Sequence, residues 1–204
     1  MKDTIIFDVD GTLLDTERAQ LKALKQVLAQ HGQQYSLDDL RVIFGVPGKE
    51  ALNRLGVKDV DAAYLEWGKA IEAYLDEVAL FYGITDVLKA LKSKGKKLGI
   101  VTSKTRQQLQ HEFTPFGINK YFDVMITADD TDRPKPDPAP LRLCIERLGT
   151  TVDDVLYIGD SIYDYACARD AKVMFALALW GAHETEGIDT QYVLSEALDI
   201  LNIV

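Results

Sequence analysis

The sequence has only two cysteines, Cys144 and Cys167, among 204 residues. They show no CxxC or Cys/His spacing, so a disulfide framework or a zinc site is not expected, and buried thiols in a reducing compartment are the simpler interpretation. The three histidines are scattered and suggest no metal site. No apolar run approaches the ~20 residues needed to span a bilayer. Residues Met1–Asp3 lead directly into a short apolar run without a signal-peptide pattern, so we expect a cytoplasmic protein.

Positive charge is also scarce. Lysine and arginine together number 23 against 32 aspartates and glutamates, which gives a formal net charge of −9. An acidic surface repels nucleic acid and anionic membranes, so we expect neither as a partner. A protein of this charge that binds a small phosphorylated metabolite must concentrate its few cations, or a metal ion, at the site. The oligomeric state is left open by the sequence.

Five short apolar runs predict buried parallel strands, because each is too short for a helix and continuously apolar. Segments with helical spacing lie between the later runs, and three of them stop at Gly95, Gly117 and Gly149. This alternation, from about residue 84 onward, predicts an α/β fold with a doubly wound parallel sheet. The predicted strands are Thr4–Phe7, Lys97–Val101, Asp123–Ile126, Val155–Ile158 and Val173–Leu177.

Residues 16–80 break the alternation, because their apolar positions recur at helical spacing throughout. An insertion of about 65 residues is too long for a simple crossover between strands. We therefore predict an α/β core domain of residues 1–15 and 81–204 and an all-helical second domain of residues 16–80. The predicted helices of this insertion contain Leu21, Leu24 and Leu28, begin at Ser36, and cover Pro47–Leu55 and Val60–Leu80.

Polar side chains follow four of the predicted strands, and in an open parallel sheet ligands bind beyond the carboxyl ends of the strands. We therefore expect carboxylates, hydroxyls and a lysine to converge at one edge of the sheet. These residues are Asp8, Asp10, Gly11 and Thr12 after the first strand, Thr102 and Ser103 after the second, Lys135 after the third, and Asp160, Ser161 and Asp164 after the fourth.

This set of residues fits phosphoryl transfer. Several carboxylates at one edge repel one another unless a hard divalent cation lies among them, and oxygen ligands suit Mg²⁺. Asp8 and Asp10 are two residues apart, so in extended chain their side chains share a face. A carboxylate held by Mg²⁺ can attack phosphorus while its neighbour moves the leaving-group proton. Lys135, the Thr102 hydroxyl and nearby backbone N–H groups are available as donors to the phosphoryl oxygens.

Four segments, in order and at strand ends, resemble the motifs of the haloacid dehalogenase superfamily. They are Asp8–Thr12, Ile100–Ser103, Lys135–Pro138 and Ile158–Asp164. The resemblance covers essentially the whole chain. The helical insertion after the first motif resembles the cap of the branch that contains phosphoglycolate phosphatase and β-phosphoglucomutase. The resemblance implies a capped core fold and a magnesium-dependent phosphatase for a small phosphomonoester.

The resemblance also implies a role for each matching carboxylate. Asp8 would be the nucleophile and a magnesium ligand. Asp10 would be the general acid/base, and its carbonyl would also bind the metal. Asp160 would complete the protein's magnesium ligands, and Asp164 would support the metal shell through water.

The same resemblance assigns the phosphate contacts. Thr102 and Lys135 would hold the transferring phosphoryl group, and Asp15 and Thr16 would lie at the cap junction, with a hinge or orienting role. Further phosphate or substrate contacts are expected at Gly11, Thr12, Ser103 and, in the cap, Lys49.

Plainer interpretations remain open for several of these residues. Asp8 and Asp10 could be solvated carboxylates of a turn. Lys135 lies in a proline-rich loop of a kind that is commonly exposed, and Asp164 could be only a favourable charge at the start of a helix.

Other polar and aromatic residues near the motifs are expected to have ordinary surface or packing roles. A solvated lysine at a helix start is as good an interpretation of Lys49 as a substrate contact. We expect Lys104 and Arg133 to lie on a solvated face, and Trp180 to be a packing residue.

The alternatives in function lie mostly within the superfamily. Its dehalogenases do not keep an aspartate two residues after the nucleophile, so Asp10 argues against that branch. Its β-phosphoglucomutases have a histidine where this chain has Gln20, which weakens the mutase hypothesis. The segment Phe44–Glu50 fits a phosphoglycolate phosphatase or a pyrophosphate-cleaving relative better. A non-enzymatic module that binds a phosphorylated ligand is the alternative of a different class, because fold alone does not give function.

Overall fold

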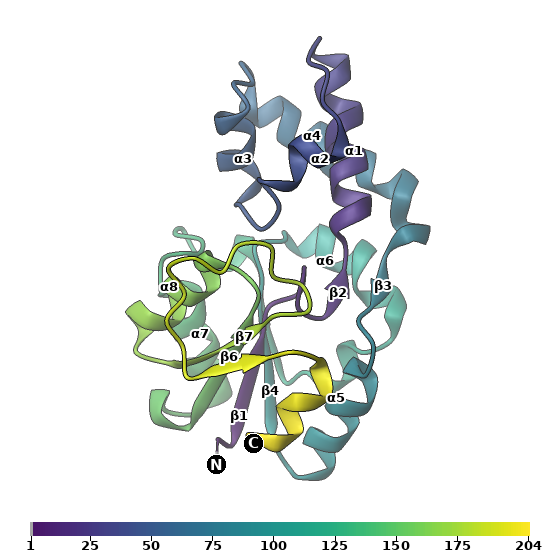
Figure 1. Ribbon diagram of the computed structural model, residues 1–204. Helices are drawn as coiled ribbons and strands as arrows, with labels where there is room; N and C mark the ends of the chain where they lie inside the picture. Colours follow the sequence, from purple (N-terminus) through teal and green to yellow (C-terminus); the bar gives the residue numbers. More distant parts are fainter. Residues whose placement is uncertain (1) are drawn as a thin grey trace. The chain divides into compact units, whose positions relative to one another are not determined.

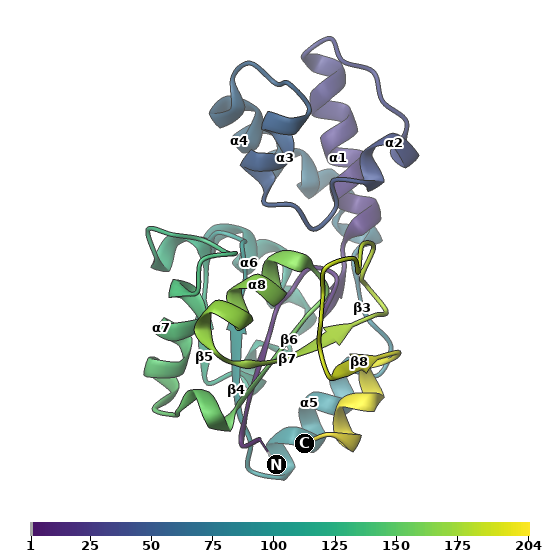
Figure 2. The same ribbon diagram turned by 60° about the vertical axis from the view of Figure 1, so that its left-hand side comes forward.

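The computed structural model describes residues 2–204, and the chain forms two compact units. One unit consists of the residues up to Leu14 together with Leu80–Val204, and the other of Asp15–Ala79. Figures 1 and 2 show the elements of each unit from two sides. No helix among residues 2–204 has both the length and the apolar character needed to cross a membrane.

The larger unit is built on a six-stranded sheet with the order β5-β4-β1-β6-β7-β8, and every neighbouring pair is parallel. The chain builds outward from β1 to one edge and then returns to build from β6 to the other, so the strand order reverses beside β1. In open parallel sheets, ligands bind beyond the carboxyl ends of the strands at such a reversal. The strands are β1 (Thr4–Phe7), β4 (Lys97–Val101), β5 (Val124–Ile126), β6 (Val155–Gly159), β7 (Met174–Ala178) and β8 (Tyr192–Leu194).

The central strands read as continuous apolar runs because both faces of the sheet are covered. Ile6 points to one face, where it joins a buried cluster with residues of α7 (Ala139–Leu148) and α8 (Ile162–Ala171). Phe7 points to the other face, where its ring lies 6.1 Å from that of Phe122. Helices α7 and α8 lie together on the first face, and α5 (Ile84–Ser93) lies on the opposite side (Figures 1 and 2).

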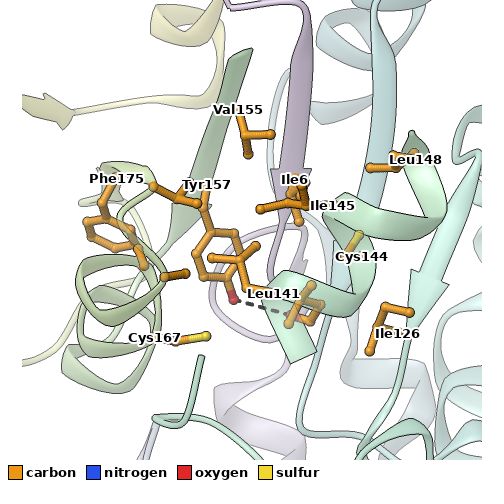
Figure 3. Packing of buried hydrophobic residues seen from close by; sticks show 14 of the residues in the cluster. Ile6, Ile126, Leu141, Cys144, Ile145, Leu148, Val155, Tyr157, Cys167 and Phe175 are labelled. Atoms are coloured by element: carbon orange, nitrogen blue, oxygen red, sulfur yellow. Dashed lines mark hydrogen bonds between the residues drawn. The ribbon is translucent and has the colours of Figure 1, made fainter. Parts of the chain in front are cut away.

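Tyr157 lies in the middle of the cluster under α7 and α8, and it is fully buried (Figure 3). Both cysteines belong to this cluster as free, buried thiols, as the sequence indicated. Burial raises the pKa of the Cys144 thiol to about 12 and does the same for Cys167. The cysteines are therefore apolar packing residues.

The five predicted strands are confirmed to within one or two residues at their ends. The predicted helix ends at Gly95 and Gly149 are also confirmed, and Gly149 adopts the left-handed conformation typical of a helix stop. The helix predicted to run to Gly117 is shorter. The α-helix α6 covers Arg106–Glu112, and Thr114–Phe116 forms a separate 3₁₀ turn, because Pro115 has no N–H to continue the helix.

The smaller unit is helical and has its own core. Leu21, Leu24 and Leu28 of the first helix are buried, as the spacing predicted. Ser36 caps the second helix by accepting a hydrogen bond from the Asp39 amide, while the Asp39 carboxylate accepts one from the Ser36 amide. The helices of this unit are α1 (Glu17–Gln30), α2 (Leu37–Arg41), α3 (Gly48–Arg54) and α4 (Val60–Ala70).

The single helix predicted over Val60–Leu80 is wrong in its second half. Helix α4 ends at Ala70, a 3₁₀ helix covers Ile71–Glu77, and the chain then becomes the short strand β3 (Ala79–Leu80). This strand pairs with β2 (Leu14–Asp15), so the two chain segments that connect the units form a separate two-stranded sheet. Pairing between segments so far apart in the chain leaves no trace in local periodicity.

Candidate active site

The first loop of the site leaves β1 at Asp8, whose amide still donates to the Ile158 carbonyl of β6 (2.9 Å). The chain then turns sharply at Gly11, which has φ +80°. The amide of Gly11 donates to the Leu14 carbonyl at 2.8 Å, which closes the turn. Glycine is required here for a steric reason as well as for its positive φ, because a Cβ would lie 2.3 Å from an Asp160 carboxylate oxygen. The Gly11 turn therefore packs directly on a carboxylate from another strand end.

Lys135 is buried and lies between two carboxylates. Its Nζ is 2.6 Å from Asp8 Oδ1 and 2.6 Å from Asp164 Oδ1. Nζ also donates to the Val101 carbonyl (3.4 Å) and the Tyr157 hydroxyl (3.3 Å). An exposed position in the proline-rich loop is therefore excluded for Lys135. Burial alone would lower the pKa of this ammonium, but the two carboxylates raise it, so Lys135 is a fixed positive charge.

Asp164 belongs both to the start of α8 and to the buried centre. It is the third residue of the helix and forms a capping box with Ser161, whose hydroxyl donates to Oδ2 at 2.5 Å. Its other oxygen, Oδ1, accepts from Lys135 and from the Tyr157 hydroxyl (2.8 Å). Burial opposes ionisation, but Lys135 and these hydrogen bonds lower the pKa of Asp164 below its ordinary value. Both carboxylate oxygens thus have protein donors.

Asp160 completes a group of three buried carboxylates. One oxygen each from Asp8, Asp160 and Asp164 lies within 4.8 Å of the others, which is close enough for one metal ion. Asp160 also accepts a hydrogen bond from the Thr12 hydroxyl (3.0 Å). No Asp10 side-chain oxygen joins this group among the described residues.

The charges of this group fit a divalent cation. When all three carboxylates are ionised, Lys135 leaves two negative charges in excess in a buried space. Burial, with help from the neighbouring carboxylates, raises the pKa of Asp8 to about 7 and that of Asp160 well above its ordinary value. Such shifts show that one lysine does not balance the carboxylate charge buried here. Oxygen donors only, at this spacing, are the ligand set that Mg²⁺ prefers.

Asp10 is paired with a different lysine, Lys104. Nζ of Lys104 lies 2.9 Å from Asp10 Oδ1 and also donates to the Glu112 carboxylate. The prediction that Lys104 is solvated is wrong, since only 6% of its side chain is exposed. The physical reason is Glu112, which reaches the same space from α6 and supplies a second negative charge. A signal was present in the sequence: Glu112 follows the buried Leu109 by three positions, and a carboxylate on a buried helix face needs a cation.

The second strand end carries Thr102, which is buried, and Ser103, which is half-buried. The Thr102 hydroxyl oxygen accepts a hydrogen bond from the Lys104 amide at 3.1 Å. The hydroxyl proton is therefore directed away from that amide. Arg133, by contrast, is exposed as expected, with an ion pair to Asp137 (3.2 Å).

Lys49 lies in the helical unit and has contacts within it. Its Nζ is 2.6 Å from Asp61 Oδ1 and 5.9 Å from the centre of the Tyr64 ring. The hydrogen bond to Asp61 raises the pKa of Lys49, whose side chain is 59% exposed. These contacts are those of a solvated surface lysine at a helix start.

The loop after β7 supports the first loop of the site, and sequence reasoning missed this role. Trp180 packs edge-on against Phe81, with ring centres 6.5 Å apart, which fits the expected packing role. Its indole N–H also donates to the Thr12 carbonyl at 3.0 Å. The next residue, Gly181, lies so close to the Gly11 carbonyl that a Cβ would be 1.8 Å from it. The Gly11 turn is thus held between the Asp160 carboxylate and this loop.

The chain is similar to known hydrolases along most of its length. The family model described as haloacid dehalogenase-like hydrolase matches residues 5–178. The pyrophosphatase PpaX of Bacillus velezensis is 30% identical over 204 residues, which span 98% of this chain and 94% of that protein. A crystal structure from Lactobacillus plantarum, named as a candidate phosphoglycolate phosphatase, has a TM-score of 0.95 at 30% identity and covers 100% of both chains. A candidate haloacid dehalogenase-like hydrolase from Bacteroides fragilis has a TM-score of 0.91 at 27% identity, and covers 98% of this chain and 100% of that one.

Proposed function

Because the chain belongs to the haloacid dehalogenase-like hydrolase family, we propose that it is a Mg²⁺-dependent phosphatase that hydrolyses a small phosphomonoester through an aspartyl-phosphate on Asp8. The observation that carries the proposal is the environment of Asp8. This carboxylate is buried at the end of the central strand, bound by Lys135, and grouped with Asp160 and Asp164 at metal-binding distance. A solvated turn carboxylate has no such surroundings.

The metal would be held by Asp8 and Asp160, with Asp164 behind them, since the two oxygens of Asp164 already accept hydrogen bonds from protein groups. The backbone carbonyl of Asp10 is the further ligand that the family resemblance implies. Bound Mg²⁺ would offset the excess carboxylate charge and would polarise the phosphoryl group as a Lewis acid. The coordinating oxygens and their charge support this assignment.

The reaction has two steps on this chain's residues. In the first, an Asp8 oxygen forms a bond to phosphorus as the bond to the leaving oxygen breaks, and Asp10 gives that oxygen a proton. In the second, Asp10 takes a proton from water as the water oxygen attacks phosphorus, which releases inorganic phosphate and restores Asp8. The Lys135 ammonium and the Thr102 hydroxyl would stabilise the phosphoryl oxygens in both steps, with N–H groups near Gly11 and Ser103.

The helical unit, Asp15–Ala79, serves in this proposal as the cap that selects the substrate. Phosphoglycolate is a candidate because of the name given to the Lactobacillus plantarum structure, and pyrophosphate because of PpaX. The mutase alternative is weaker. Gln20, at the position where that family has histidine, donates its side-chain amide to the Thr16 hydroxyl (3.1 Å) within the helical unit.

The proposal is tested by release of phosphate from p-nitrophenyl phosphate with Mg²⁺, with EDTA, and in variants. We expect activity to need Mg²⁺ and to fall by about 10³-fold or more in Asp8→Asn. Asp86→Asn is the matched control, because Asp86 is an exposed aspartate on α5 and its loss should leave the rate unchanged. Full activity in Asp8→Asn would contradict the assignment of the nucleophile. A panel containing phosphoglycolate, pyrophosphate and sugar phosphates then ranks the substrates by kcat/KM.

A further inference from the structure

Two lysines enter the site, and they bind different carboxylates. Lys135 binds Asp8, and Lys104 binds Asp10. Lys104 follows β4 by three residues, at the same strand end as Thr102, and both its side chain and that of Glu112 are about 95% buried. Lysine is rarely buried this deeply unless it is paired, so its burial beside the site indicates a role other than keeping the surface soluble.

The side chain of Lys104 is held from two directions. Its Nζ donates to the Glu112 carboxylate at the end of α6 and lies 2.9 Å from Asp10 Oδ1. Burial would lower the pKa of Lys104, but the Asp10 and Glu112 carboxylates raise it above its ordinary value, so the ammonium stays charged. The result is a fixed cation whose position is set by Glu112 of α6.

The backbone of Lys104 makes a second connection. Its amide donates to the Thr102 hydroxyl oxygen (3.1 Å), so one residue contacts both Thr102 and Asp10. The charged hydrogen bond between Lys104 Nζ and Asp10 Oδ1 is stronger than a neutral one, so it fixes the carboxylate rotamer more firmly. The Asp10 side chain is 22% exposed, so its carboxylate is within reach of substrate and water while Lys104 binds Oδ1.

We propose that Lys104, anchored by Glu112, is a positioning residue that holds the Asp10 carboxylate in the orientation from which it transfers protons. The inference rests on the proposed function, in which Asp10 is the general acid/base. With Oδ1 bound to Lys104, Oδ2 is the oxygen that carries the proton. Oδ2 gives the proton to the leaving oxygen in the first step and takes one from the attacking water in the second. Lys104 itself exchanges no proton.

The test compares two leaving groups. Glycerol phosphate is an alkyl phosphomonoester, and its alkoxide is a poor leaving group that needs a proton donor. The p-nitrophenolate of p-nitrophenyl phosphate leaves readily without one. The parameter kcat/KM covers the steps up to release of the alcohol. It therefore depends on Asp10 as the proton donor and not on its later role as the base. We expect Lys104→Met to lower kcat/KM for glycerol phosphate by about 10²-fold and for p-nitrophenyl phosphate by less than about threefold. A general loosening of the fold would lower both alike.

Two further variants keep the test valid if Lys104→Met folds poorly because Glu112 is left unpaired. Glu112→Gln should shift the ratio of the two kcat/KM values in the same direction by a smaller factor. The double variant Lys104→Met/Glu112→Gln carries no buried unpaired charge, and it should match Lys104→Met in that ratio, since Glu112 acts only through Lys104. Thermal unfolding of each variant reports folding separately.

Lys96→Met is the matched control. Lys96 is also a buried lysine of the core, with an ion pair to Asp3 (3.1 Å), but it precedes β4 at the opposite end of the strand. Its loss should lower the melting temperature and leave the ratio of the two substrates unchanged.

Asp10→Asn separates this inference from the proposed function. It should lower kcat/KM for glycerol phosphate far more than kcat/KM for p-nitrophenyl phosphate. If Asp10→Asn shows that pattern and the folded Lys104 variants keep the wild-type ratio, the positioning role is overturned and the proposed function stands. If Asp10→Asn lowers kcat/KM equally for both substrates, the role of Asp10 as proton donor is wrong and the inference fails with it.

Discussion

Gly181 is the position where one added methyl group should damage the site most clearly. A Cβ there would lie 1.8 Å from the Gly11 carbonyl oxygen, whereas real Cβ contacts are essentially never under 3.0 Å. One of the two loops must therefore move by about 1 Å or more. Movement of the Gly11 turn is restricted, because the Asp160 carboxylate packs against the Gly11 Cα. A displacement of 1 Å at reacting groups can cost about 10²-fold in rate, and we expect a loss of kcat/KM of that size in Gly181→Ala.

The assay is hydrolysis of p-nitrophenyl phosphate at saturating Mg²⁺, with urea unfolding of the same preparation to separate activity from stability. Leu179→Ala is the control, since Leu179 lies in the same loop and is 42% exposed. Its loss should change neither the rate nor the unfolding midpoint greatly. A folded Gly181→Ala protein with wild-type kcat/KM would refute the reasoning that this loop fixes the Gly11 turn.

Two other predictions concern the buried charges. Mg²⁺ should raise the free energy of unfolding by about 2.7 kcal/mol at 100 times its dissociation constant, measured by urea unfolding, and Asp160→Asn should remove most of that gain; an equal gain in the variant would exclude Asp160 as a ligand. Tyr157→Phe removes a buried hydrogen bond to the Asp164 carboxylate (2.8 Å) and should cost about 1.5–3 kcal/mol in the same measurement, with an unchanged value counting against that bond.

Much of the core fold could be predicted because local sequence determines it. The run Thr4–Phe7 has three consecutive large apolar residues after Thr4, which is typical of a strand covered on both faces, and the structure buries all four residues. What local sequence could not predict depends on distant partners. The edge strand β8 has three residues, of which only Leu194 is buried, so no run marks it. Pairing of β2 with β3 joins segments more than 60 residues apart.

The site shows the same division between local and distant causes. The polar residues at the strand ends could be named from order and spacing, and the structure brings Asp8, Lys135, Asp160 and Asp164 together. The burial of Lys104 could not be predicted in this way. A lysine in a loop after a strand is usually solvated, and only the arrival of Glu112 from α6 decides otherwise.

The two lysines explain how an acidic chain can handle phosphate. The carboxylates that would react must be close together, and each needs its own counter-charge if it is to stay in place without substrate. Lys135 supplies this charge for Asp8, but it is shared with Asp164, so the group still lacks a cation that a metal can provide. Lys104 is shared between Asp10 and Glu112, and that second group lies outside the metal-binding set of three carboxylates. The proposed nucleophile and the proposed proton carrier are therefore bound by different lysines, so a metal ion could bind at Asp8 while Lys104 keeps the orientation of Asp10.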